Sequence, residues 1–138
     1  MDCIQKEVRI HALVDSPYAI KLYQTIKTSS NIYMLMDYCN GFDLSVLLRT
    51  RKRIPQQEAR LIIRKMVNGI KDIWKLNIIH RDMKLANILL HFPDHPELGG
   101  MSKVEKRAWL SKLNLSETRF EAKISDFGLS TILDSATQ

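Results

Sequence analysis

The feature that most constrains the fold of this chain is an apolar run that polar side chains interrupt. Residues 78–90 read IIHRDMKLANILL. The polar residues within this run are His80, Arg81, Asp82, Lys84 and Asn87. Segments that supply a hydrophobic core do not normally carry polar side chains at this density. The segment is therefore either a solvated turn between two buried elements or the loop of an active site.

The part of the chain before this loop is predicted to contain one helix and one hairpin. Apolar residues recur at helical spacing over residues 2–14, and Pro17 limits this helix because proline disfavours helical angles in the residue before it. Residues 19–27 and 31–39 are β-rich runs separated by turn residues. They predict an antiparallel hairpin whose second strand is buried, since that run is almost wholly apolar.

A long helix is predicted over residues 55–76, because Pro55 suits a first helical turn and apolar residues then recur at steps of three and four. The residues expected to form its buried stripe are Ala59, Ile63, Met66, Ile70 and Ile73. Shorter helices are predicted at residues 42–49 and 106–113, and a last strand at 120–125. The order of these elements predicts an α+β fold with a small sheet at one end and helices at the other.

Charge and composition exclude several classes of protein. The net charge is +6, and two basic runs contribute most visibly to it: Arg49, Arg51, Lys52 and Arg53, and then Lys103, Lys106 and Arg107. Nucleic-acid binding is disfavoured because aromatic residues are not interleaved with these charges. A solvated basic face is the preferred interpretation, and an acidic protein partner stays open.

No apolar run is long enough to span a membrane, and no signal-peptide pattern opens the chain. Cys3 and Cys39 lack the spacing of a metal or redox motif. These observations predict two reduced thiols in a cytoplasmic protein.

Two motifs give the interrupted run a chemical interpretation. His80-Arg81-Asp82 with Asn87 fits H-R-D-x-x-x-x-N, and Asp126-Phe127-Gly128 fits the D-F-G element. With both motifs in register, the chain resembles the eukaryotic protein kinases from their helix C to just past D-F-G. Lys84 and Leu129 favour the serine/threonine type, with the nearest similarity to the unc-51-like and calcium/calmodulin-dependent groups.

The resemblance implies roles in phosphoryl transfer from ATP to protein hydroxyls. Asp82 would accept the proton of the substrate hydroxyl, and Lys84 would contact the γ-phosphate. Asn87 and Asp126 would hold Mg²⁺, which prefers oxygen ligands. Arg81 often binds a phosphorylated activation loop in this family.

The resemblance also implies a nucleotide site. Glu7 corresponds to the helix-C glutamate that pairs with the ATP-binding lysine. Met36 would be the gatekeeper, and the backbone of Asp37 and Cys39 would bind adenine. Asp43 would reach the ribose, and Leu89 would form the floor of the adenine pocket. His80 and Phe127 resemble members of the stacked spine that joins the two lobes.

The departures from the family pattern are as informative as the matches. The sequence contains no G-x-G-x-x-G, no V-A-I-K-like strand before Glu7 and no A-P-E-like element. We therefore expect an incomplete protein-kinase-like fold of about half the usual domain length, in which residues 1–39 are an N-lobe remnant with the hinge and residues 40–138 are part of the C-lobe. An isolated chain of this kind is expected to be poorly stable, because the two-stranded hairpin would have no further sheet partner. It is expected to lack useful catalysis, because ATP would lack the glycine-rich loop and the lysine.

The segment from about residue 91 to residue 121 is expected to be an insertion between two short strands. Its Trp109, Leu110 and Leu113 are expected to pack locally, with a partner-binding surface as the alternative. The candidate phosphorylation positions after D-F-G are Ser130, Thr131, Ser135 and Thr137. The functional hypothesis is a serine/threonine protein kinase that uses Mg²⁺ and ATP, and the alternative is a catalytically inactive fragment that acts as a protein-interaction module.

Overall fold

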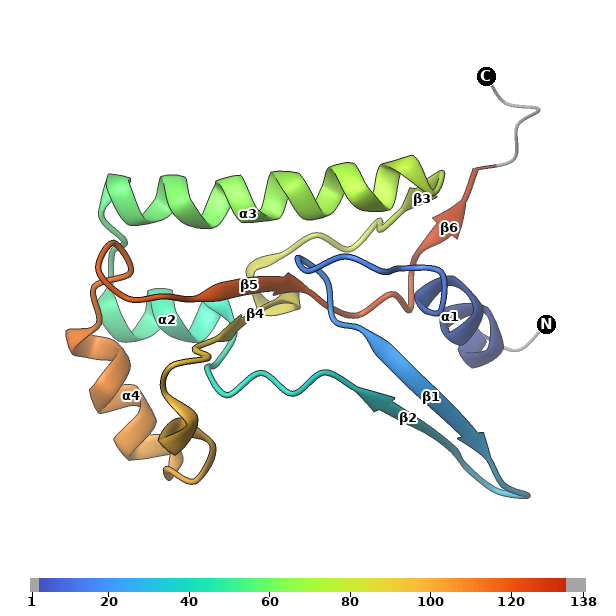
Figure 1. Ribbon diagram of the computed structural model, residues 1–138, viewed down its shortest axis with the longest axis horizontal. Helices are drawn as coiled ribbons and strands as arrows, with labels where there is room; N and C mark the ends of the chain where they lie inside the picture. Colours follow the sequence, from blue (N-terminus) through green and yellow to red (C-terminus); the bar gives the residue numbers. More distant parts are fainter. Residues whose placement is uncertain (1–2, 134–138) are drawn as a thin grey trace.

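The computed structural model describes residues 3–133 (Figure 1). The helices within this range are α1 (Cys3–His11), α2 (Leu44–Arg51), α3 (Gln56–Lys75) and α4 (Lys103–Lys112), with 3₁₀ turns at η1 (Leu85–Asn87) and η2 (Pro96–Gly99). The strands are β1 (Leu22–Lys27), β2 (Ile32–Met36), β3 (Ile78–Ile79), β4 (Ile88–His91), β5 (Glu121–Ile124) and β6 (Thr131–Ile132). They form three antiparallel pairs, β1–β2, β3–β6 and β4–β5. The prediction of an α+β fold is confirmed.

The β4–β5 pair forms the centre of the hydrophobic core. Ile88 is paired with Ile124, and both side chains are fully buried. The chain around Tyr18 extends this unit, since Ile124 N–H donates to the Tyr18 carbonyl and Ile20 N–H donates to the Ile124 carbonyl. Helix α3 lies so close to β5 that a Cβ on Gly69 would sit 2.8 Å from Ile124 Cδ1. The glycine therefore allows the longest helix to pack directly on this pair.

Helix α3 begins and ends within one residue of its predicted bounds, and its predicted stripe is only partly buried: Ile73 is buried, and Ala59 and Met66 are half-buried. Ile63 and Ile70 are instead 56% and 42% exposed, whereas Ile62 and Gly69 are buried. Both sets have helical spacing, so periodicity alone could not distinguish them. The close approach of Gly69 to β5 determines which face turns inward. Pro55 lies at the N-cap, one position before the first helical residue.

The prediction that the second strand of the hairpin is buried is wrong. Both strands expose large apolar side chains, among them Tyr23, Ile26, Tyr33 and Leu35. Within residues 3–133 each strand of the hairpin pairs only with the other. Helix α1 borders one face, where Val8 and Arg9 line a pocket together with Thr25 and Ile32 of the strands. The hairpin extends away from α2, α3 and α4 toward the lower right of Figure 1.

Helix α4 lies in the segment that joins β4 to β5, beside α2 (Figure 1). A complete capping box begins this helix: Ser102 Oγ accepts from Glu105 N–H, and Glu105 Oε2 accepts from Ser102 N–H. Leu110 and Leu113 are buried, so local packing of these two residues is confirmed. Trp109 is half-buried and packs edge-on against Phe92 with ring centroids 5.0 Å apart.

A buried ion pair ties this segment to the helices. Arg51 donates two hydrogen bonds to Glu58, at 2.6 and 2.7 Å, and Glu58 Oε2 also accepts from Leu115 N–H at 3.1 Å. The Arg51 hydrogen bonds hold the pKa of the Glu58 carboxyl below its usual value. The sequence predicted that Arg51 belongs to a solvated basic face. This prediction is wrong for Arg51, because its side chain is buried in the pair with Glu58. In residues 3–133, no helix is both long and apolar enough to cross a bilayer.

Candidate active site

The interrupted apolar run forms a tight loop between two short strands. Arg81 has φ of 65°, in the left-handed region, and this reverses the chain after β3. His80 supports the turn from inside: its Nδ1 accepts from Asp82 N–H at 3.2 Å, and its Nε2 lies 3.0 Å from the Ser125 carbonyl. Because Nδ1 accepts, Nε2 must carry the proton that is donated to Ser125. The buried histidine therefore positions Asp82 from behind.

The Asp82 carboxylate is the centre of a polar cluster. Its Oδ2 accepts from Lys84 Nζ at 2.6 Å and from Asn87 Nδ2 at 2.9 Å. Asn87 Nδ2 also donates to the Asp82 carbonyl at 2.9 Å, which fixes the loop across its mouth. The hydrogen bond from Lys84, supported by the one from Asn87, lowers the pKa of Asp82. The same contact raises the pKa of Lys84. Asp82 is thus held as a carboxylate that can accept a proton.

The Asn87 backbone joins this loop to the D-F-G segment. Its carbonyl accepts from Ser125 N–H at 2.9 Å and from Ser125 Oγ at 3.0 Å. Asp126 follows directly, and its φ of 64° turns its exposed side chain out of the strand direction. Residues that are 39 positions apart in the sequence are therefore brought to one site by the pairing of β4 with β5. Asp126 also contributes to the raised pKa of Lys84, which places its charge near the same cluster.

The donor set suits Mg²⁺ that is held jointly with a phosphate. Asn87 is 6% exposed, and its Nδ2 is committed to Asp82 while Oδ1 accepts no hydrogen bond from residues 3–133. Asp126 Oδ1 contacts Gly128 N–H at 3.2 Å. Mg²⁺ commonly takes one or two protein oxygens and completes its shell with phosphate and water. In the described residues, no group of three or more His, Cys, Asp and Glu side chains is placed to hold a metal.

Phe127 lies at the centre of a stack of three rings. It is fully buried, 4.7 Å from His11 and 5.2 Å from His80 between ring centroids. His11 is held in place because its Nε2 lies 2.7 Å from the Ile20 carbonyl. His11 was not predicted to lie beside Phe127. His11 follows Glu7 by four residues, so both side chains lie on the same face of α1. This spacing was the sequence pattern that could have placed His11 near the D-F-G segment.

Glu7 lies beside the D-F-G segment. Its Oε2 would be 3.5 Å from a Cβ on Gly128, and Asp126 Oδ1 would be 3.2 Å from the same point. Both carboxylates therefore lie near Gly128. Two carboxylates this close to one backbone position suit a site where cations gather. The pairing of Glu7 with a lysine stays a prediction.

The expected adenine side of the site is more open. Met36 is 38% exposed, and Leu89 is half-buried opposite Lys123 in β5. The Asp37 side chain is occupied: it accepts from Lys123 Nζ at 2.7 Å and Tyr23 O–H at 2.6 Å. Burial opposes its ionisation, but these hydrogen bonds prevail and lower the pKa of Asp37. Any contact with adenine would thus come from the Asp37 backbone.

Cys39 and Asp43 flank the segment that follows β2. Burial raises the pKa of the Cys39 thiol to about 11, so this free cysteine is neutral at physiological pH. Asp43 caps α2, and its Oδ1 accepts from Ser45 N–H at 2.8 Å and Val46 N–H at 3.1 Å. Contact with a ribose would therefore fall to the other oxygen, Oδ2. The side chain of Cys3 lies outside the described part of the chain.

The segment after D-F-G is folded back onto the loop of residues 80–87. Arg81 Nε donates to the Leu129 carbonyl at 2.6 Å, and Ser130 Oγ donates to the His80 carbonyl at 3.2 Å. Ser130 is 1% exposed and Thr131 is half-buried in β6. Neither hydroxyl is freely accessible in this arrangement. The other two candidate phosphorylation positions, Ser135 and Thr137, lie outside the described residues.

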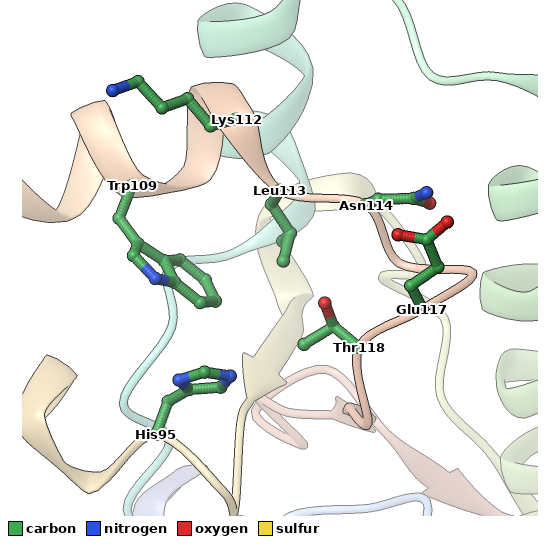
Figure 2. A pocket seen from close by; sticks show the side chains of 7 residues that line it. All are labelled: His95, Trp109, Lys112, Leu113, Asn114, Glu117 and Thr118. Carbon is green, nitrogen blue, oxygen red and sulfur yellow. The ribbon is translucent and has the colours of Figure 1, made fainter.

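A separate pocket lies in the segment between β4 and β5 (Figure 2). Its volume is about 330 Å³, and its lining comprises His95, Trp109, Lys112, Leu113, Asn114, Glu117 and Thr118. The rings of His95 and Trp109 meet edge-on, with centroids 5.0 Å apart. This pocket shares no residue with the Asp82 cluster, so the two are separate features of the chain.

Comparison with known proteins identifies the family. The sequence matches the family described as "Protein kinase domain" over residues 1–138. This chain belongs to the protein kinase family. It is 32% identical over 88 residues to serine/threonine-protein kinase PLK2 of Mus musculus, covering 64% of this chain and 13% of the relative. It is 32% identical over 89 residues to serine/threonine-protein kinase ATG1a of Arabidopsis thaliana, covering 64% and 14%.

A further relative, serine/threonine protein kinase OSK3 of Oryza sativa subsp. indica, is 26% identical over 129 residues, or 94% of this chain and 20% of the relative. The chain thus matches 13–20% of the length of these curated relatives. The resemblance to serine/threonine kinases and the expected kinase-like fold are confirmed. The boundary between lobes near residue 39 and the insertion at residues 91–121 stay predictions.

Proposed function

We propose that this chain forms the catalytic-loop and magnesium-binding part of a cytoplasmic serine/threonine protein kinase, which transfers the γ-phosphoryl group of ATP to protein hydroxyls. The observation that carries the proposal is the cluster in which Asp82 is hydrogen-bonded to Lys84 and Asn87, while the Asn87 carbonyl is tied to Ser125 directly before Asp126. Phosphoryl transfer depends on such positioning and on charge stabilisation.

Each residue of the cluster has a distinct task. Asp82 orients the attacking hydroxyl and accepts its proton as the oxygen–phosphorus bond forms and the bond to the bridging oxygen of ADP breaks. Lys84, at 53% side-chain exposure, can turn from Asp82 toward the transferred phosphoryl group. Asn87 Oδ1 and the Asp126 carboxylate would hold Mg²⁺, which supplies positive charge against the phosphates.

The nucleotide would occupy the side of the site bounded by Met36, Leu89 and the chain after β2. Glu7 lies beside Gly128 and would form an ion pair with the lysine that orients the phosphates. The ring stack around Phe127 holds α1 against the catalytic loop, so that Glu7 and Asp126 keep their relative positions. The ligands of the kinase would be ATP and a protein substrate that contains serine or threonine. The segment between β4 and β5 is a candidate surface for a further protein partner.

The test is phosphate transfer by the full-length protein from γ-labelled ATP to a library of serine and threonine peptides. We expect Asp82→Asn to lower kcat by about 10²-fold or more while ATP still binds. Asp126→Asn should instead abolish Mg²⁺-dependent ATP binding in calorimetry. Asp94→Asn is the matched control, because Asp94 is exposed in the segment between β4 and β5.

The proposal is wrong if the wild-type protein transfers no phosphate, or if Asp82→Asn retains the wild-type rate. Equal losses in Asp82→Asn and Asp94→Asn would also contradict it, because the effect would then not depend on the loop.

A further inference from the structure

The two basic runs of the sequence meet at one pocket. Helices α2 and α4 lie side by side at the lower left of Figure 1, although about 50 residues separate them in the chain. A pocket of about 450 Å³ lies between them. Its lining comprises Val46, Arg49 and Thr50 from α2 and Arg107 from α4. We call it the α2–α4 pocket.

Not every cation of the two runs is available to a ligand. Arg51 is withdrawn into the buried pair with Glu58. Lys106 lies over the ring of Phe42, with Nζ 5.4 Å from the centroid. Arg49 and Arg107, in contrast, are exposed, and within residues 3–133 neither has a carboxylate within ion-pair distance. Arg49 Nη2 donates one hydrogen bond, to Ser45 Oγ at 3.4 Å, and this neutral partner leaves its charge in place. Two guanidinium groups without a carboxylate partner among residues 3–133 therefore line the same pocket.

The carboxylates of the neighbouring elements are already engaged. Glu105, on the same helix as Arg107, accepts from Ser102 N–H at 2.9 Å in the capping box. Glu58 is bound by Arg51 and by Leu115 N–H. Asp43 caps the opposite end of α2 from Arg49. Among residues 3–133, none of these carboxylates forms an ion pair with Arg49 or Arg107, so both guanidinium groups can bind a carboxylate of a ligand.

We propose that the α2–α4 pocket binds an acidic peptide segment of a partner protein, with Arg49 and Arg107 each holding one carboxylate. A guanidinium offers a planar fork that matches a carboxylate through two parallel hydrogen bonds. Thr50 adds a hydroxyl that donates or accepts, and Val46 supplies an apolar wall for the stem of a Glu side chain. The volume lies within the range of a pocket that encloses a few side chains.

The same features disfavour a nucleic acid as the occupant. Proteins that bind single strands combine positive charge with exposed aromatic side chains on which bases stack. The pocket lining contains no aromatic residue. The nearest aromatic groups are used within the fold, because Phe42 lies beneath Lys106 and Trp109 packs on Phe92.

The experiment measures binding without ATP, so its outcome is independent of the kinase proposal. The full-length protein is titrated into fluorescein-labelled octapeptide EEDEEDEE, with the isosteric QQNQQNQQ as the neutral probe. A 20-nucleotide single strand and vesicles containing phosphatidylserine are titrated in parallel. The variants are Arg49→Glu with Arg107→Glu, the charge-preserving Arg49→Lys with Arg107→Lys, and a control with the same charge change, Arg64→Glu with Lys71→Glu on the exposed surface of α3.

We expect the double Glu variant in the pocket to weaken binding of the acidic peptide by about tenfold or more, and the control on α3 by less than about threefold. The double Lys variant should lose part of the affinity, because it keeps the charge but not the fork. Thermal unfolding of each variant, compared with wild type, reports whether its fold is retained.

Three outcomes would overturn the proposal. The first is an equal loss of affinity for the acidic peptide in the double Glu pocket variant and the α3 control, and the second is wild-type affinity in both the double Lys and the double Glu variants. The third is tighter binding of the oligonucleotide or the vesicles than of the acidic peptide. Absence of binding to EEDEEDEE by the wild-type protein would overturn it as well.

Discussion

The β4–β5 pair and the β1–β2 hairpin are both short antiparallel units, yet their surroundings differ sharply. Leu90 in β4 is fully buried, whereas Leu35 in β2 is 58% exposed. Helix α3 packs on β5, and the chain after β2 pairs with β4 through the hydrogen bonds of Gly41 and Leu90. Apolar content therefore does not decide burial; a covering layer does.

This contrast divides the proposed active site. The side proposed for phosphate transfer is built on β4 and β5, where Asp82, Asn87 and Ser125 hold one another in place. The side proposed for adenine borders the hairpin, where Met36 is partly exposed. The hydrogen-bonded loop around Asp82 therefore lies beside a more exposed region of the chain.

The largest expected difference between the two regions is in the cost of removing a leucine. We expect Leu90→Ala to lower the free energy of unfolding by about 2–5 kcal/mol, because it leaves a cavity in a packed core. Leu35→Ala should change it by less than about 0.5 kcal/mol, since the side chain is largely in water. Urea denaturation followed by circular dichroism measures both. Equal costs would show that the hairpin is covered in solution.

A smaller loss of unfolding free energy is expected when the ion pair that links the two regions is removed. Lys123 in β5 contacts Asp37 at the end of the hairpin, and both side chains are about 15% exposed. Lys123→Ala should lower the free energy of unfolding by about 1–3 kcal/mol, because the Asp37 carboxylate loses its partner. Lys21→Ala, which removes an exposed pair with Asp15, is the control and should have a smaller effect.

The difference in unfolding free energy between wild type and Lys123→Ala can also be measured as a function of pH. The folded pKa of Asp37 is lowered, so its contribution to stability is present above its unfolded value and is lost as the pH falls through the folded pKa. The gap between wild type and Lys123→Ala should therefore shrink in acid. A gap that stays constant from neutral to acidic pH would rule out the ion pair as its source.

The smallest expected effect is a shift in a pH profile on the catalytic side. Lys84 lowers the pKa of Asp82, so Lys84→Ala should raise that pKa and move the acid limb of kcat/KM to higher pH. Lys75→Ala, which removes a lysine paired with Asp72 at the end of α3, should leave the limb in place. Shifts of equal size would show that net charge, rather than the loop, controls ionisation of the base.

Most residues of the proposed active site could be selected from the sequence because motif spacing is a local property. His80, Asp82 and Asn87 lie within eight positions, and Asp126 lies in a second short motif. The capping box of Ser102 and Glu105 is likewise a local pattern, since both residues belong to one helical turn. Local hydrogen bonds of this kind are encoded by neighbouring residues.

The tertiary structure decided what depends on partners distant in the sequence. The inward face of α3 was set by the contact of Gly69 with Ile124, which helical periodicity does not contain. The third ring of the Phe127 stack came from His11, more than 100 positions away. Arg51 does not contribute to a solvated basic face, because folding brings it into a buried ion pair with Glu58.

The sequence by itself determined the chemistry of this protein: which carboxylates, amides and cations it carries and how they are spaced in each motif. Only the tertiary structure decided which of them meet, which are neutralised and which stay free, because the energy of burying or pairing a side chain depends on contacts between segments that the chain brings together on folding.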